Sequence, residues 1–437
     1  NEGGVRGTGR FTLIAPSVGT DGRLSGIRFG LEDESARLNL NTVLSVDADP
    51  ANQGKNVGRQ MLMALPGMRE DIADAILDWM DLDDVSREYG AEDDVYASLS
   101  PPYATPMEPL KTLEELLLVR DVTPALFFGY DMNRNYLVDR SESNAPILID
   151  ADNSDGAMNC GWSAYLTASS KESNLRPDGE AKIDLNQEDL KALHEALDSA
   201  VGTEWANFIV AYRQYGPYTA KNQRMRMQEI TTYAVDLDTK PKDPSPITKL
   251  LDLIARSDQV LSVGGNNALE SPFPEGPVLS ATYLPKLLEN CTVGSSGATG
   301  RVNVNLAPRV VLSAILCADP DLAQDTSQIE QLVDDIVAER PQDPTQADEE
   351  FKYETWIYTR GIVTLDQMKK LIPYVCAGGA VYRTQAVGYF DKGGPSARIE
   401  VVIDATSSPP SIVSWREMTH LGRGYPLETL GIEAEGP

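Results

Sequence analysis

The chain of 437 residues contains only two histidines and four cysteines. The cysteines stand far apart and show no CxxC pair, so the ligand spacing of a zinc ribbon is absent. With so few histidines, the chain has few residues from which a Ser-His-Asp or Cys-His catalytic site or a two-histidine metal site could be built. One or two disulfides remain an open alternative for the cysteines. The residues concerned are His194, His420, Cys160, Cys291, Cys317 and Cys376.

Positive charge is also scarce. The chain has 38 lysines and arginines against 66 acidic residues, which gives a formal net charge of −28. Binding to nucleic acid depends on lysine and arginine side chains that displace counterions from the phosphates. Nucleic acid is therefore a poor partner, whereas metal cations and basic protein surfaces are favoured.

Long apolar runs are missing too. The sequence has no run of about 18 or more apolar residues, the length at which a membrane-spanning helix is expected. It begins at Asn1 without an initiator methionine or a signal peptide. We therefore expect that an N-terminal piece has been processed, cut off or left out.

One short motif occurs three times, at residues 37–42, 182–187 and 301–306. In each copy a cation and apolar residues alternate with Asn or Asp, which predicts a short strand, and the last Asn is expected to cap a helix. Each copy is followed by two apolar helical segments that a turn separates. A repeated helix hairpin is the simplest explanation, because recurrence on this scale marks a supersecondary unit used several times.

Strand-like alternation is concentrated at the two ends of the chain. It covers residues 11–14 and 27–29 near the start, and residues 380–389, 397–403 and 412–416 near the end. Because two or three strands are marginal by themselves, we expect both ends to share one antiparallel sheet. The predicted fold is α+β, a pilin-like antiparallel sheet with a large inserted all-α domain of helix-hairpin units.

The predicted organisation has five segments. The N-terminal part of the sheet is followed by a first helical-hairpin subdomain, a middle inserted helical repeat, a third helical repeat and the C-terminal strands. These segments are residues 1–41, 42–142, 143–300, 301–375 and 376–437.

The sharpest local signal is the segment 131–142. Its oxygen-bearing side chains fall at positions 1, 3, 5, 9 and 12 of an EF-hand loop, and a carbonyl at position 7 is a further donor. Tyr136 stands where the loop normally needs glycine, and a left-handed conformation would cost it roughly 1 kcal/mol. The alternative is a polar loop without an ion. The predicted calcium ligands are Asp131, Asn133, Asn135, Leu137, Asp139 and Glu142.

A second acidic group lies in the segment 78–94. Its carboxylates follow a predicted helix end and could meet across a loop, where their mutual repulsion favours a cation or raised pKa values. A solvated acidic loop is the alternative, and no pocket signal supports catalysis. The candidate metal ligands here are Asp81, Asp83, Glu92 and Asp93.

Residues 30–129 resemble the K-type minor pseudopilin of type II secretion, also called general secretion pathway protein K. The resemblance depends on the order and spacing of several motifs, and residues 301–416 resemble the C-terminal half of that family more weakly. The motifs occupy residues 30–42, 75–83, 89–93, 100–103 and 113–120.

The resemblance implies a helical domain inserted into a pilin-type sheet, calcium in that domain, and no enzymatic activity. It implies a subunit at the pseudopilus tip that nucleates assembly with the I-type and J-type minor pseudopilins, for protein export across the outer membrane. Secreted substrate or the outer-membrane secretin are further implied partners. It also implies a periplasmic location, anchored in the inner membrane through an N-terminal helix that this sequence does not include.

Three features depart from the family. The N-terminal helix is missing, residues 131–142 with the middle repeat exceed the usual length, and Asp121 replaces an expected glycine. The alternative function is a calcium-stabilised adaptor or substrate-binding module outside the cytoplasm. A more distant one is a DNA-binding protein, because residues 65–68 resemble the turn of a helix-hairpin-helix motif.

Overall fold

The computed structural model divides the chain into two compact units. Unit 1 comprises Asn1–Ser173, Thr299–Pro344 and Tyr374–Pro437, and unit 2 comprises Asn174–Ala298 and Thr345–Pro373. The predicted segment 301–375 is thus shared between the units, and the five-segment organisation stays a prediction. The structure describes residues 8–137, 139, 142, 160–217, 226–230, 233–237, 244–254, 261–263, 267–294, 298–341 and 347–432.

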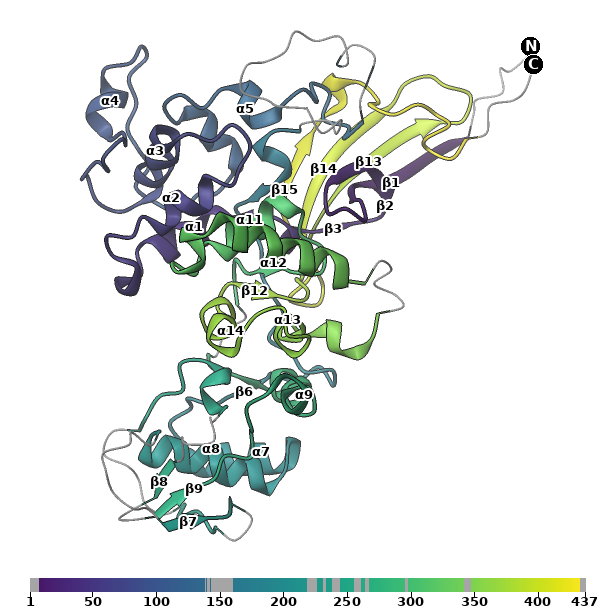
Figure 1. Cartoon of the computed structure of the whole chain (residues 1–437). Coiled ribbons are helices and arrows are strands. Elements are labelled where there is room, and N and C mark those ends of the chain that lie inside the picture. The colour runs from purple at the N-terminus through teal and green to yellow at the C-terminus, as the bar shows by residue number, and fades with distance from the viewer. Residues whose placement is uncertain are drawn as a thin grey trace. The chain divides into compact units, whose positions relative to one another are not determined.

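Unit 1 contains a six-stranded sheet made from both ends of the chain, as predicted. The strand order is β15-β14-β13-β1-β2, all neighbours are antiparallel, and β3 pairs with β13 beside β1. The central contact joins β1 to β13, from Gly9 opposite Phe390 to Ile14 opposite Gln385, and Figure 1 shows the purple and yellow strands side by side. The strands are β1 (Gly9–Val18), β2 (Leu24–Phe29), β3 (Glu32–Asp33), β13 (Val381–Phe390), β14 (Ala397–Asp404) and β15 (Ser411–Glu417).

The two faces of this sheet differ in an unusual way. One face is buried, yet it carries charged side chains such as Arg398 and Glu400. The pairing of Val401 with Trp415 places these two residues on the opposite face, because side chains alternate along a strand. Trp415 is 65% exposed, and Phe11, on the same face, is 76% exposed. The apolar face of the sheet is therefore the more open one.

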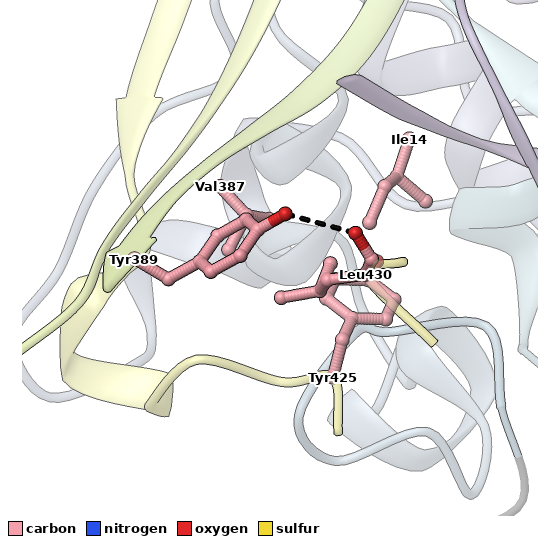
Figure 2. Packing of buried hydrophobic residues seen from close by; sticks show 5 residues of the cluster. All are labelled: Ile14, Val387, Tyr389, Tyr425 and Leu430. Atoms are coloured by element: carbon pink, nitrogen blue, oxygen red, sulfur yellow. Dashed lines mark hydrogen bonds between the residues drawn. The ribbon is translucent and has the colours of Figure 1, made fainter. Parts of the chain in front are cut away.

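The far end of the buried face has an apolar core. Ile14, Val387 and Tyr389 from the strands pack against Tyr425 and Leu430 of the C-terminal segment 418–432 (Figure 2). The Tyr389 hydroxyl donates to the Leu430 carbonyl over 2.8 Å, so the one polar atom of this ring is satisfied inside the core. The C-terminal segment thereby covers this part of the sheet.

The threefold motif has the same local structure in each copy. The short strand of each copy pairs in parallel with a second short strand that ends the same repeat. The pairs are β4 (Leu38–Asn39) with β5 (Leu166–Thr167), β6 (Ile183–Asp184) with β10 (Cys291–Thr292), and β11 (Val302–Asn303) with β12 (Val375–Cys376). One prediction was wrong: the cap of helix α1 (Leu40–Asp47) is Asn39, which accepts from the Asn41 amide, and not the last Asn.

That last Asn instead joins distant parts of its repeat. Asn41 accepts from the Leu110 amide over 2.8 Å and donates to the carbonyls of Leu110 and Ala168. Asn186 makes the same three contacts in unit 2 with residues further along the chain. Asn305 donates to the Ala377 carbonyl over 3.1 Å. An amide serves here because it both donates and accepts, which lets it satisfy a backbone N–H and C=O together.

A helix pair follows each copy. A polar contact joins the two helices of each pair: Arg59 with Asp74, His194 with Asn207, and Arg309 with Asp334. The description as helix-hairpin-helix-like stays a prediction. The pairs are α2 (Val57–Leu62) with α3 (Glu70–Met80), α7 (Leu190–Ala200) with α8 (Thr203–Tyr215), and α11 (Arg309–Leu316) with α12 (Thr326–Glu339).

The remaining elements are short. The α-helices are α4 (Asp93–Ala97), α5 (Pro124–Phe128), α9 (Pro277–Ser280), α10 (Leu284–Asn290), α13 (Trp356–Thr359) and α14 (Leu365–Leu371). A small sheet in unit 2 contains β7 (Arg226–Gln228), β8 (Leu261–Val263) and β9 (Asn267–Leu269). The longer 3-10 helices are η3 (Leu113–Leu118), η6 (Leu250–Leu253) and η9 (Glu349–Lys352), and the three-residue ones are η1 (Glu34–Ala36), η2 (Pro50–Asn52), η4 (Trp162–Ala164), η7 (Leu322–Gln324) and η10 (Thr419–Leu421).

The turn at Asp121, where the family resemblance leads us to expect a glycine, has a left-handed backbone. Its φ is +62°, in the region that glycine adopts most readily. Aspartate and asparagine tolerate this region better than most other residues. Asp121 therefore has a backbone conformation that a glycine would also adopt.

We expect Asn186→Ala to destabilise unit 2 by roughly 2–4 kcal/mol, because it leaves the buried N–H and C=O of Ile247 without partners. Hydrogen exchange, read separately over the two units, measures the loss. Gln187→Ala is the matched control, since the Gln187 side chain makes no hydrogen bond with a described residue. Equal losses for the two variants would contradict the assignment.

Candidate metal centres

Three carboxylates meet where helix α3 ends. Asp78 lies in the last turn of α3, Asp81 is its C-terminal cap, and Glu92 precedes α4 after the loop 82–91 has folded back. One carboxylate oxygen of each residue lies within 4.8 Å of those of both others. These residues are called the acidic centre below. The negative end of the helix dipole adds to their attraction for a cation.

Arg87 neutralises only part of the acidic centre. Its guanidinium donates to Asp78 over 2.7 Å, to Asp81, and to Asp47 over 3.1 Å. These hydrogen bonds outweigh the effect of burial and raise the pKa of Arg87. With Glu92, four carboxylates face one cation, so the surplus of negative charge is large.

The carboxylate of Glu92 has no hydrogen-bond partner among the described residues. The side chain is 5% exposed, and neither carboxylate oxygen accepts a hydrogen bond from the described residues. Burial, together with Asp78 and Asp81, raises the pKa of Glu92 to about 7. Burial also raises the pKa of Asp78 and of Asp81, although Arg87 opposes it. Buried carboxylate oxygens with open lone pairs are the donors that Ca²⁺ prefers, so the residues fit this ion.

The structure brings together two of the four residues predicted here. Asp81 and Glu92 meet, whereas Asp83 accepts from the Val85 amide and Asp93 accepts from the amide and hydroxyl of Thr105. The third member, Asp78, was not predicted as a ligand. Its spacing of three residues from Asp81 was the available signal, because such residues share one side of a helix.

The EF-hand-like loop 131–142 is arranged differently. Asp131 and Glu142 are buried, but their carboxylates accept hydrogen bonds from main-chain amides of the loop itself. Burial raises the pKa of Asp131 to about 6. Two of the charged residues that were predicted as calcium ligands are thus already engaged as hydrogen-bond acceptors. Within the described residues, the loop does not bring three carboxylates as close together as the acidic centre does.

The middle positions of this loop do converge. The side-chain amides of Asn133 and Asn135 both donate to Asp139, and the Leu137 amide donates to the Asn135 side chain. Tyr136 has a φ of +59°, the left-handed conformation that glycine supplies at this position of an EF-hand. The backbone therefore turns as the spacing predicted. Val138, Arg140 and Ser141 lie outside the described residues.

The loop is also fixed to the sheet. The carbonyl of Arg134 accepts from Gln385 over 2.9 Å and from the buried guanidinium of Arg398. Asn135 donates to the carbonyl of Gly424 in the C-terminal segment. Order in the loop is therefore coupled to the core in Figure 2, to which Leu137 also contributes.

The family comparison concerns the part of the chain that contains the acidic centre. Residues 36–129 match the family model described as type II secretion system (T2SS), protein K. This confirms the resemblance that the sequence motifs indicated, over the helical part of unit 1 from residue 36 to α5.

A solved structure gives a weaker comparison. It is the crystal structure of the GspK-GspI-GspJ complex from the enterotoxigenic Escherichia coli type 2 secretion system. The aligned chain is 12% identical, with 95% of this chain and 88% of that chain covered, and the TM-score is 0.34. A common overall arrangement is not established at this score. The search of curated proteins gives no match. Among the described residues, no helix combines the length and the apolar character that crossing a bilayer requires.

Proposed function

We propose that this protein is a non-enzymatic minor pseudopilin at the tip of a type II secretion pseudopilus. The observation that carries the proposal is the match of residues 36–129 to the protein K family model, in a segment inserted between β-strands that come from both ends of the chain. An insertion of this kind gives a subunit a sheet for assembly and a bulky helical part at its end. In this role the protein acts during export across the outer membrane.

The open apolar face of the sheet supports this function. Phe11 and Trp415 are exposed on this face, and a sheet face that carries exposed large apolar side chains is a candidate interaction site. We propose that the apolar N-terminal helix that the family resemblance implies packs against it. The same helix would anchor the protein in the inner membrane, with the rest in the periplasm, before the pseudopilus assembles.

The proposed partners are the I-type and J-type minor pseudopilins, with secreted substrate or the outer-membrane secretin as further contacts. We also propose Ca²⁺ as the bound ion. Asp78, Asp81 and Glu92 would hold it in the acidic centre, and the side chains around Asp139 would form a second, weaker site in the EF-hand-like loop. A bound Ca²⁺ would supply positive charge that holds the end of α3 and the loop 82–91 together.

Co-expression with the I-type and J-type pseudopilins tests the assembly. We expect the protein, with its native N-terminal segment, to elute with both partners as one complex by size-exclusion chromatography. We expect Trp415→Glu to weaken the complex at least tenfold, because it places a charge on the apolar face. Arg10→Glu, on the other side of the sheet, is the control.

The competing functions give other results. A stable, calcium-responsive protein that never elutes with the two partners would favour an extracytoplasmic adaptor and contradict the proposal. Retention on DNA that falls with salt would favour the hairpin-based alternative.

A further inference from the structure

A cavity of about 400 Å³ lies in unit 1 where β1 separates from β13. The two strands pair only as far as Ile14 and Gln385, and β13 then pairs with β3 instead. The wall is completed by the loop after β11 and by the end of α12. Its polar side chains are Ser17, Arg28, Glu32, Asp33, Asn305 and Arg340.

Arg340 is a buried cation in this wall. The side chain belongs to a residue that is 7% exposed, and its guanidinium donates to the carbonyl of Ala307 over 2.8 Å. No carboxylate of the described residues forms an ion pair with it. Burial, and then the nearby Arg309, lower the pKa of Arg340, and Asp21 offsets this only in part. Buried charges are normally paired, and Arg340 has no carboxylate partner among the described residues although it lines a cavity.

A second arginine faces the same cavity. Arg28 is exposed and donates to the carbonyl of Leu31 over 2.6 Å, again a main-chain acceptor. The two acids of the wall are already engaged. Glu32 pairs with the buried Arg37, and Asp33 accepts from three donors around it. The wall can therefore still donate hydrogen bonds to a ligand, from the guanidinium groups of Arg28 and Arg340.

We propose that this cavity binds a carboxylate through Arg340 and Arg28. A guanidinium offers paired N–H donors that match the two oxygens of a carboxylate. The size suits one acidic side chain or a small dicarboxylate. Glu32 and Asp33 nearby disfavour a dianionic phosphate. The ligand is either an acidic side chain of a partner protein or a free small carboxylate, and the site does not depend on the pseudopilin assignment.

Isothermal titration of the purified chain with glutarate tests the site, with neutral glutaramide as the matched compound. We expect glutarate to bind in the millimolar range and glutaramide not to bind. Arg28→Gln should weaken glutarate binding at least fivefold, and Arg340→Gln should abolish it. Arg23→Gln, in the same hairpin but outside the cavity wall, should leave the affinity unchanged. Arg28 is exposed, so its variant remains informative if Arg340→Gln does not fold.

The outcomes separate the sources of the carboxylate. If Arg28→Gln also weakens binding to the I-type and J-type pseudopilins, the ligand is a partner side chain; an effect on glutarate alone indicates a free carboxylate. Unchanged glutarate affinity in both arginine variants would overturn the proposal. So would a wild-type protein that does not bind glutarate.

Discussion

Replacing Arg383 with methionine should lower the free energy of unfolding of unit 1 by about 3–5 kcal/mol. Arg383 lies between two buried carboxylates. Its guanidinium donates to both oxygens of Glu34, which is fully buried, and to Glu400 over 3.0 Å. Removing the cation leaves two buried charges without compensation, which costs far more than the intact pair contributes.

The effect has a defined dependence on pH. In the wild type, burial raises the pKa of Glu34 and of Glu400, but Arg383 outweighs it and holds both values below the usual range. Because the folded pKa lies below the unfolded one, the stabilisation is present above pH 4.5 and is lost as the pH falls below it. Without Arg383, burial is opposed only by smaller effects such as the charge of Arg37, and we expect the sign to reverse. The loss in the variant should therefore be largest near neutral pH and shrink towards pH 4.5.

Urea unfolding of wild type and variant from pH 4 to 8 measures this difference. Arg69→Met is the control, in the same unit but away from the sheet. Arg69 pairs with Asp71, both side chains are more than one-third exposed, and such pairs contribute roughly 0–1 kcal/mol. A loss from Arg383→Met that does not change with pH would show that lost packing, and not the unpaired carboxylates, causes it.

The predicted sheet was correct because its evidence is local. Alternation along residues 11–14 and 380–389 indicates strands, and two marginal groups of strands need each other. The sequence does not reveal the pairing of β3 with β13, or that Arg383 meets Glu34 across most of the chain. Those contacts depend on the register of distant segments. A charged side chain on a strand is ordinarily read as facing solvent, so the buried charged face was not foreseen.

The two metal centres show the same limit. The loop 131–142 has ligand spacing that can be read directly, and its backbone turns at Tyr136 as that spacing requires. The spacing could not show that Asp131 and Glu142 would accept main-chain amides instead. In the acidic centre, a loop that folds back brings Glu92 to Asp78, so no fixed spacing in the sequence predicts that these residues meet. The repeated Asn of each motif was visible in the sequence. Its role in joining distant parts of a repeat was not, because it depends on residues such as Leu110 that lie far along the chain.

The largest calcium-dependent effect should come from Glu92→Gln, and its sign should change with the metal. The folded pKa of Glu92, about 7, lies above its unfolded value of 4.5, so stability falls as the pH rises through this interval. At pH 8 with a chelator, the variant lacks the uncompensated charge and should be more stable than the wild type by roughly 1–3 kcal/mol. With calcium at about 100 times its Kd, the wild type should gain about 2.7 kcal/mol, and the variant much less.

Thermal unfolding at pH 8 should therefore give a higher melting temperature for Glu92→Gln than for the wild type with chelator, and the reverse order with calcium. Asp139→Asn provides the comparison for the EF-hand-like loop, because Asp139 is the acceptor on which Asn133 and Asn135 converge. If that loop also binds calcium, Asp139→Asn should reduce the calcium-dependent gain without raising stability in the chelator, since the amides of Asn133 and Asn135 already engage its carboxylate. A Glu92→Gln protein that keeps the full calcium shift would rule out the acidic centre as the site. Loss of the shift in Asp139→Asn alone would then assign the ion to the loop.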